Sequence, residues 1–234
     1  MPLNQKWQQQ WNKKQRSLKT SDKIISIDSN SPQPEFIQMA AGVILNGGMV
    51  IFPTTCLYGL AADALNPVAV QNVFKAKQRS ENNPLLVLVK NRKALESIVT
   101  CIPPVAVTLM ETFWPGGLTL VFNAGKNLPQ SLTAGTGKIG IRIPAHKVAV
   151  ALVNALENPI IGTSANLSQQ GGCSYIPNLD SEIVRCSDLI LDAGLLKGGL
   201  GSTVIDVTTT PPVILREGLV SEKKIHLILK SVKK

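Results

Sequence analysis

The amino-acid sequence predicts a single α/β domain in which helices flank a twisted, mixed sheet that carries a concave cationic pocket. Short apolar runs of strand length alternate with segments whose apolar residues recur at helical spacing. No internal repeat or low-complexity linker interrupts this alternation, and a hydrophobic content of 44% with 17% charged residues is typical of a compact globular protein. Gly, Pro and Asn gather at the ends of the strand-like runs, where α/β proteins usually bind ligands.

The first half of the domain alternates between the two patterns. Residues 35–46 have apolar side chains at helical spacing and end at Gly47-Gly48, which predicts a helix that stops there. Residues 49–52 form a short buried strand in this reading. Asn66-Pro67 combines a favoured N-cap with proline at the first helical position, so a second helix is expected to begin there. The continuous apolar run over 85–89 is typical of a strand buried on both faces.

The second half of the domain is predicted to continue in the same way. Helices are expected over 91–102, 103–113 and 145–156, and a basic amphipathic helix at the C-terminus. Strands are expected over 118–122, 139–143, 160–161, 189–191, 203–207 and 213–215.

The net charge of +9 is concentrated at the two ends of the chain. Residues 1–20 carry +5 and residues 221–234 carry +4, so the residues between them are neutral overall. We therefore expect a basic, flexible N-terminal arm over 1–33, the folded domain over 34–220 and a basic helix or tail over 221–234. An organelle-targeting segment would also be basic like residues 1–20, although their Gln-rich, Ser-poor composition argues mildly against that reading.

Several classes of protein are excluded by the same sequence. No apolar run is long enough to cross a bilayer, so no membrane span is expected. Four cysteines without C-x-x-C spacing and only two histidines predict no metal site, and we expect reduced cysteines in a cytoplasmic protein. A Walker loop (G-x-x-x-x-G-K-[ST]) is absent. Around Gly137-Lys138, Leu132 stands in place of the first glycine and Ile139 in place of the Ser or Thr. The dinucleotide-binding pattern G-x-G-x-x-G is also absent.

A cationic cluster stands out within the neutral domain. Residues 75–93 hold six basic side chains and one acidic one. Lys77 and Arg79 end the helix that begins at Asn66, and a Lys and an Arg beside a buried strand can clamp a polyanion. Cations at a helix C-terminus also offset the helix dipole, so part of the cluster can be purely structural.

Three further features point to the same chemistry. The strand at 160–161 runs into small hydroxyl and amide residues at 163–166, and a glycine-rich segment over 198–203 leads into another strand. Arg142 and Arg216 lie in or next to apolar runs, where an arginine usually needs a partner. Each feature alone also fits a cap or a tight turn. Together they predict a cationic, hydroxyl-lined, glycine-edged pocket suited to a nucleoside triphosphate.

These residues resemble the motifs of the YrdC family of threonylcarbamoyl-AMP synthases, in collinear order over about residues 35–218. The matching segments are Pro53–Leu60 (P-T-D/E-T-x-Y-G-L), Lys77-Gln78-Arg79 with Asn83-Pro84-Leu85 (K-x-R and P-L), Trp114–Thr119 (W-P-G-P-x-T), Ile141–Pro144 (R-x-P), Ser164-Ala165-Asn166 (S-x-N), Gly201–Val204 (S-T-V) and Leu215–Gly218 (L-R-x-G). Two positions depart from the pattern. Thr55 stands where the family usually has Asp or Glu, and Cys56 where it often has a threonine that contacts the amino-acid substrate.

The resemblance implies the single-domain form of an enzyme that condenses L-threonine, bicarbonate and ATP into threonylcarbamoyl-AMP and releases pyrophosphate. The product would pass to the downstream tRNA threonylcarbamoyl transferase machinery for t6A modification next to the anticodon, and tRNA itself is a further predicted contact. Mg²⁺ is expected to arrive with the ATP, because no carboxylate cluster is evident to hold it.

The resemblance also implies roles for individual residues. The catalytic set at the phosphates and the reacting carbamate would be Lys77, Arg79, Ser164 and Asn166. The ATP-binding set would be Arg79, Asn83, Lys138, Ser164 and Arg216. The threonine-binding set would be Cys56, Arg142, Gly162 and Ser202.

Two other functions stay open from the sequence. One is a non-catalytic RNA-binding protein that uses a concave basic surface, although an aromatic content of 4% is low for base stacking. The other is a carbamoyl-transfer module of another pathway, as in hydrogenase maturation. The zinc-finger and acylphosphatase segments of those proteins are not evident in this sequence.

Overall fold

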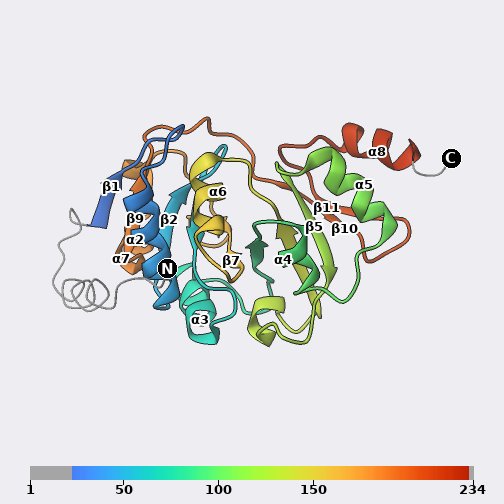
Figure 1. The fold of residues 1–234 in the computed structure, drawn as a ribbon, viewed down its shortest axis with the longest axis horizontal. Helices are drawn as coiled ribbons and strands as arrows, with labels where there is room; N and C mark the ends of the chain where they lie inside the picture. Colours follow the sequence, from blue (N-terminus) through green and yellow to red (C-terminus); the bar gives the residue numbers. More distant parts are fainter. Residues whose placement is uncertain (1–22, 232–234) are drawn as a thin grey trace.

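The computed structural model describes residues 23–231, which form two mixed sheets that lie side by side (Figure 1). The five-stranded sheet has the order β1-β9-β2-β3-β8, and the six-stranded sheet has the order β11-β10-β5-β6-β4-β7. The strands of the two sheets are β1 (Ile24–Ser26), β2 (Val50–Pro53), β3 (Tyr58–Ala61), β4 (Leu86–Leu88), β5 (Leu118–Asn123), β6 (Lys138–Arg142), β7 (Ile160–Ile161), β8 (Thr163–Ser164), β9 (Leu189–Asp192), β10 (Thr203–Asp206) and β11 (Val213–Arg216).

Helices pack against these sheets. They are α2 (Pro34–Leu45), α3 (Pro67–Ala76), α4 (Arg92–Glu96), α5 (Pro104–Phe113), α6 (Lys147–Asn154), α7 (Ser181–Cys186) and α8 (Glu222–Ser231), with 3-10 turns at Gln130–Thr133 and Ile176–Asn178. Asn66 caps α3 by accepting the N–H groups of Val68 and Ala69, as its sequence predicts. None of the helices within residues 23–231 is long and apolar enough to span a bilayer.

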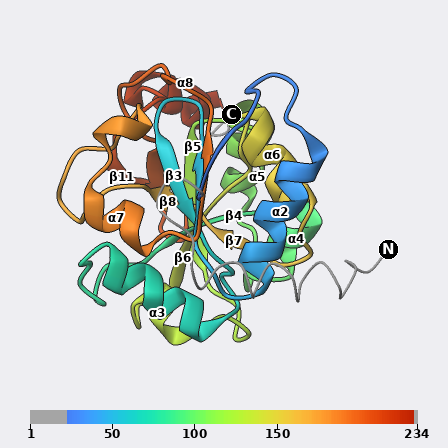
Figure 2. The same ribbon diagram turned by 90° about the vertical axis from the view of Figure 1, so that its left-hand side faces the viewer.

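The five-stranded sheet is buried on both faces, which explains the continuous apolar runs of its strands. Successive side chains of a strand point to opposite faces, so Val50 and Phe52 pack in one cluster with α2 and α6, whereas Ile51 packs in the main core. Figure 2 shows α2 and α6 on one side of this sheet and α7 on the other.

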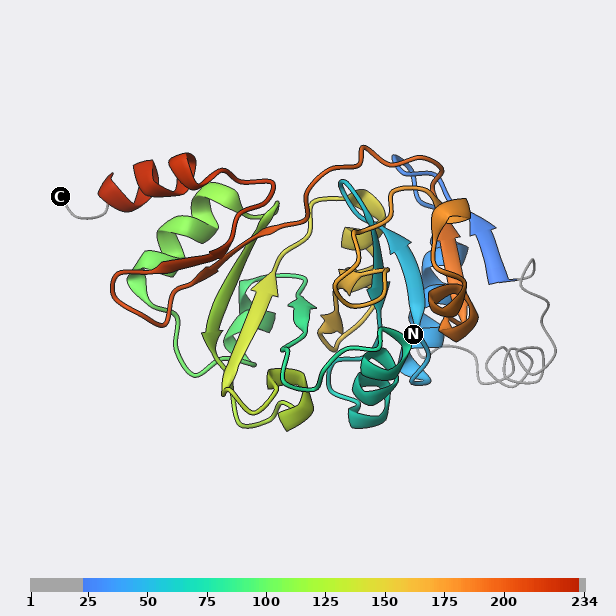
Figure 3. The ribbon, with the colours of Figure 1, turned by 180° about the vertical axis from the view of Figure 1, so that it is seen from behind.

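The α/β class is confirmed, but the strands form two sheets where one was expected. The chain crosses between the sheets at short connections that hydropathy does not mark. Gly162 separates β7, in the six-stranded sheet, from β8, in the five-stranded sheet. A longer connection, residues 193–202, leads from β9 to β10 and crosses from one sheet to the other (Figure 3). We call residues 193–202 the strap.

The predicted arm over 1–33 is wrong in its C-terminal part. Residues 24–26 form β1, which pairs in parallel with β9, and Ile27 is buried against α2. Apolar contact therefore extends the domain to residue 24, although Asp28 to Ser31 keep the polar, turn-like character that suggested a boundary. The prediction for residues 1–22 lies outside the described residues.

The helix predicted over 91–102 is shorter than expected. Only Arg92–Glu96 is helical, because Val99 then bridges to Ala124 and the N–H of Thr100 donates to the carbonyl of Asn123. The other predicted helices and strands are present with bounds shifted by at most two residues, and β1, β3, β8 and α7 are additional elements.

The strap is fastened to the five-stranded sheet by Tyr58. Its buried hydroxyl can donate its one proton to the carbonyl of Gly194 (2.7 Å) or to the carboxylate of Asp192 (3.1 Å), and it accepts the N–H of Ala193 (3.0 Å). Two backbone bonds continue the attachment, from Leu196 N to Ser174 O and from Gly198 N to Cys56 O.

Replacing Tyr58 with Phe should lower the free energy of unfolding by about 1–3 kcal/mol, because the N–H of Ala193 and the carbonyl of Gly194 lose their hydrogen bonds to the hydroxyl. Urea denaturation measures this change. The matched control is Tyr175→Phe, since the Tyr175 side chain is 41% exposed, and it should leave the midpoint unchanged. Equal midpoints for the two variants would contradict the role given to Tyr58.

Candidate active site

A cavity of about 810 Å³ lies where the two sheets meet. Its volume falls within the range of small-molecule sites. One wall comes from the β2–β3 loop with the start of β3 (Thr54 to Gly59) and from β8, and the other from the ends of β6, β10 and β11. The loops around Asn83, Gly171 and Gly199 close its edges.

Three arginines give this cavity its charge. Arg79, Arg142 and Arg216 line it, and none of the described residues that line it is an Asp or a Glu. Burial, and secondarily the proximity of Arg216, lowers the pKa of Arg142 to about 10, and the same two causes lower the pKa of Arg79. Burial also lowers the pKa of Arg216. The three guanidinium groups repel one another, and no carboxylate in the lining offsets their charge. The cavity therefore favours a bound anion.

The three guanidinium groups differ in how many hydrogen bonds they make to other protein groups. Arg79 donates from Nε to the carbonyl of Asn83 (3.0 Å) and from Nη2 to that of Pro84 (2.9 Å), which fixes its direction. Arg216 donates to the carbonyl of Ser202 (2.8 Å). The Arg142 side chain makes no hydrogen bond within the described residues, although its carbonyl accepts the N–H of Val89, so its planar fork is free for a bidentate ligand.

A pair of buried hydroxyl groups adjoins the cavity. Ser202 lines it, and the Ser202 and Thr119 hydroxyls are 2.8 Å apart, both buried. Cys56 is also buried and lines the cavity from the β2–β3 loop, next to the exposed Thr55.

Lys77 is buried and does not line the cavity. Its ammonium donates to the carbonyls of Ser164 and Asn166, both at 2.6 Å, and to the side-chain oxygen of Asn166 at 3.4 Å. Asn166 is buried too, and its amide donates to the carbonyls of Leu167 and Gln170. The predicted contact of Lys77 and Asn166 with phosphates is thus not what the geometry shows, because both side chains are occupied by protein oxygens.

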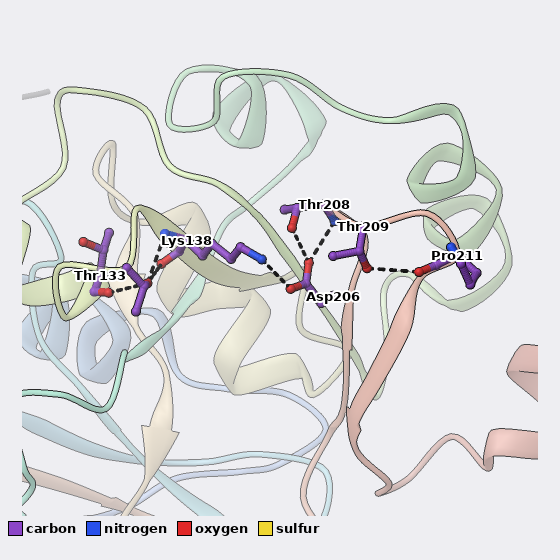
Figure 4. A network of polar contacts seen from close by, with 7 residues as sticks. Thr133, Lys138, Asp206, Thr208, Thr209 and Pro211 are labelled. Atoms are coloured by element: carbon purple, nitrogen blue, oxygen red, sulfur yellow. Dashed lines mark hydrogen bonds and ion pairs between the residues drawn. The ribbon is translucent and has the colours of Figure 1, made fainter.

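Lys138 is not among the residues that line the cavity. It begins β6, whereas Arg142 ends it, and four residues of a strand span roughly 13 Å. Its ammonium pairs with the carboxylate of Asp206 at 2.8 Å, and Thr208 donates to the same carboxylate (Figure 4). The predicted role of Lys138 in ATP binding is therefore not supported, because the carboxylate at this end of the sheet holds it.

The structure brings together the rest of the predicted set. The residues that line the cavity are Cys56, Arg79, Asn83, Arg142, Gly162, Ser164, Ser202 and Arg216. The sequence reasoning did not single out Gly171 and Gly172 or the exposed Leu200, Leu215 and Leu219, which also line it. A Gly-Gly pair soon after Ser164-Ala165-Asn166 was a usable signal for the former. Leu200 and Leu215 lie inside the glycine-rich segment and the L-R-x-G match, whereas no local signal marks Leu219.

Comparisons with known proteins agree with this geometry. The profile of the Sua5/YciO/YrdC family, described as telomere recombination, matches residues 42–218. A threonylcarbamoyl-AMP synthase of Pyrococcus abyssi is 36% identical over 197 residues, or 84% of this chain, and one of Bacillus subtilis is 34% identical over 87% of it.

The chain belongs to the Sua5/YciO/YrdC family. It spans 58% of the length of each of these two relatives. The crystal structure of P. abyssi Sua5 complexed with L-threonine superposes with a TM-score of 0.82 at 35% identity, and the match covers 88% of this chain and 60% of that one. The family and the fold expected from the resemblance are confirmed.

Gly162, at the crossing between the sheets, should not tolerate a side chain. A Cβ there would lie 2.4 Å from Cγ of the buried Leu88, so Gly162→Ala should lower the free energy of unfolding by about 1–3 kcal/mol. In a double-mutant cycle, Gly162→Ala should cost much less stability in the Leu88→Ala background than in the parent protein. Gly171→Ala is the control, since no atom lies within 4 Å of its Cβ position. An equal loss with and without Leu88 would contradict this packing constraint.

The Lys138–Asp206 pair should make stability depend on pH. Burial raises the pKa of Asp206, but hydrogen bonds from Lys138 and Thr208 outweigh burial and lower it overall. A lowered folded-state pKa contributes stability above the unfolded value of about 3.9 that is lost as the pH falls through the folded-state pKa.

Lys138→Met should therefore lower the free energy of unfolding at pH 7 by on the order of 1 kcal/mol, discounted for the partial exposure of Lys138. The difference from the parent should shrink below about pH 4. Denaturant melts across this range measure both effects. Lys90→Met is the control, because its partner Glu157 is 96% exposed. A difference that stays constant down to the lowest pH would contradict the ion pair.

Proposed function

We propose that this chain forms threonylcarbamoyl-AMP from L-threonine, bicarbonate and MgATP, with release of pyrophosphate. The observation that carries the proposal is a cavity with three arginines, no lining carboxylate and one arginine whose fork is free. Such a site suits ligands that bring a carboxylate and a polyphosphate together. The family relatives of this name support it, as does the L-threonine in the P. abyssi Sua5 structure.

The first step needs threonine held by its carboxylate with its amine free. In the proposal Arg142 takes the carboxylate through two parallel N–H bonds, while Ser202, Gly162 and Cys56 surround the amino acid. The amine nitrogen bonds to the carbon of bicarbonate, water leaves, and threonine becomes a carbamate.

The second step is a displacement at phosphorus. A carbamate oxygen forms a bond to the α-phosphorus of ATP, the bond to the β-phosphate oxygen breaks, and pyrophosphate leaves. No side-chain nucleophile is required, and the protein supplies alignment and neutralisation of charge. Arg79, aimed by its own loop, and Arg216 are placed to do this, with the Ser164 hydroxyl and Asn83 beside them.

Mg²⁺ enters this reaction as part of the substrate MgATP. The described residues contain no group of three or more His, Cys, Asp or Glu side chains able to hold a metal. The lining offers arginines and hydroxyls, which suit phosphate oxygens rather than a hard cation.

The product is a reactive mixed anhydride that a downstream tRNA threonylcarbamoyl transferase would consume. We place the reaction in the cytoplasm, where ATP is available, and the four cysteines are all free thiols.

The deciding experiment is release of pyrophosphate by the purified protein that depends on threonine, bicarbonate and ATP together, in the absence of RNA. Salt-sensitive RNA binding without such turnover would favour the alternative of a non-catalytic RNA-binding protein.

Arg142→Met should raise the KM for threonine by roughly 10- to 100-fold, because a hydrogen-bonded charge contributes about 1.5–3 kcal/mol. The KM for ATP should change much less. Steady-state kinetics with each substrate varied in turn separates the two. Arg92→Met is the control, since Arg92 pairs with Glu96 on the surface. An unchanged KM for threonine would refute the carboxylate assignment.

A further inference from the structure

We propose that Lys77 is a positioning residue, which holds the Ser164–Asn166 turn at the cavity wall without touching the substrate. The inference deepens the proposed function and rests on it. It replaces the role in phosphate binding that the sequence suggested for Lys77.

The end of α3 sends Lys77 and Arg79 to different places. Gln78 has a φ of 47°, Arg79 N donates to Phe74 O, and Gln78 N donates to Lys75 O, which is a Schellman motif with Gln at the left-handed position. The reversal at Gln78 leaves the side chain of Lys77 in the core, 1% exposed, and that of Arg79 in the cavity.

The buried ammonium makes a complete set of hydrogen bonds to one turn. It contacts the carbonyls of Ser164 and Asn166 and the side-chain oxygen of Asn166. A neutral amine has only two protons, so only the ammonium form can donate to all three oxygens. No carboxylate pairs with Lys77 within the described residues, and burial, followed by the effect of Arg79, lowers its pKa to about 7.

The turn is also tied to the backbone of Lys77. The N–H of Ser168 donates to the carbonyl of Lys77 (2.8 Å), and the Asn166 amide holds the carbonyls of Leu167 and Gln170. Lys77 therefore fixes the start of a segment that ends at Gly171 and Gly172. Ser164, Gln170, Gly171 and Gly172 all line the cavity, so a shift of the turn would move one entire edge of the site.

The role as a direct ligand predicts different kinetics from the role as a positioning residue. Loss of a phosphate ligand weakens ATP binding and turnover together. Loss of a residue that places other groups lowers turnover while ATP still binds to Arg79 and Arg216, because a misplacement of about 1 Å can reduce the rate by roughly 100-fold.

The test compares Lys77→Met with the parent and with Lys75→Met, a control on the exposed face of the same helix. For Lys77→Met we expect kcat to fall by about 100-fold while the equilibrium Kd for ATP changes by less than about threefold. Hydrogen exchange of the apo protein should also be faster over residues 164–172, on the order of tenfold, and unchanged in the strands of the five-stranded sheet. Lys75→Met should match the parent in all three measurements.

Two results would overturn the proposal. One is a rise in the Kd for ATP in proportion to the loss of kcat, with unchanged exchange over 164–172, which would make Lys77 a phosphate ligand. The other is unchanged exchange and unchanged kcat. Exchange and ATP binding are measured without turnover, so they decide the role of Lys77 even if the parent protein shows no threonine-dependent activity and the proposed function fails.

Discussion

The site depends on how closely the two sheets approach each other at Gly162. This one residue separates β7, at the edge of the six-stranded sheet, from β8 of the five-stranded sheet. The side chain of Leu88 in β4 fills the space that a side chain at Gly162 would need. The N–H of Gly162 donates to the carbonyl of Leu86 (2.8 Å), which ties the crossing to β4. Because the sheets are joined so tightly here, residues from both can face one cavity at fixed distances.

The electrostatics of the site follow from this closure. Arg79, Arg142 and Arg216 are brought into one cavity whose lining has no carboxylate, and Lys77 adds a buried charge behind its wall. Each cation loses hydration, and backbone carbonyls compensate only part of that loss. The free protein thus holds repulsion that a bound anion relieves, which favours binding and fixes where the negative charge must lie.

Much of this arrangement could be predicted from the sequence, and the failures have specific physical causes. Hydropathy identified the strands and helices because burial of apolar surface determines them, and the collinear motifs identified the family. Hydropathy could not reveal that the side chain of Lys77 points into the core and that of Arg79 into the cavity. This difference depends on the left-handed backbone conformation of Gln78, and glutamine is a residue type that rarely adopts this conformation. Nor could it reveal that Asp206, distant in sequence, pairs with Lys138.

The way the strap is attached determines which of its residues can be substituted during evolution. The strap is held by its backbone atoms, by the Tyr58 hydroxyl and by the inward side chains of Leu196 and Ser202, so its shape does not depend on its outward side chains. Leu195 and Leu200 are 74% and 62% exposed. Leu200 lines the cavity, so substitutions at this exposed position can change part of the lining while the strap keeps its backbone path. This part of the site can therefore vary in evolution while the residues nearest the reacting atoms stay constrained.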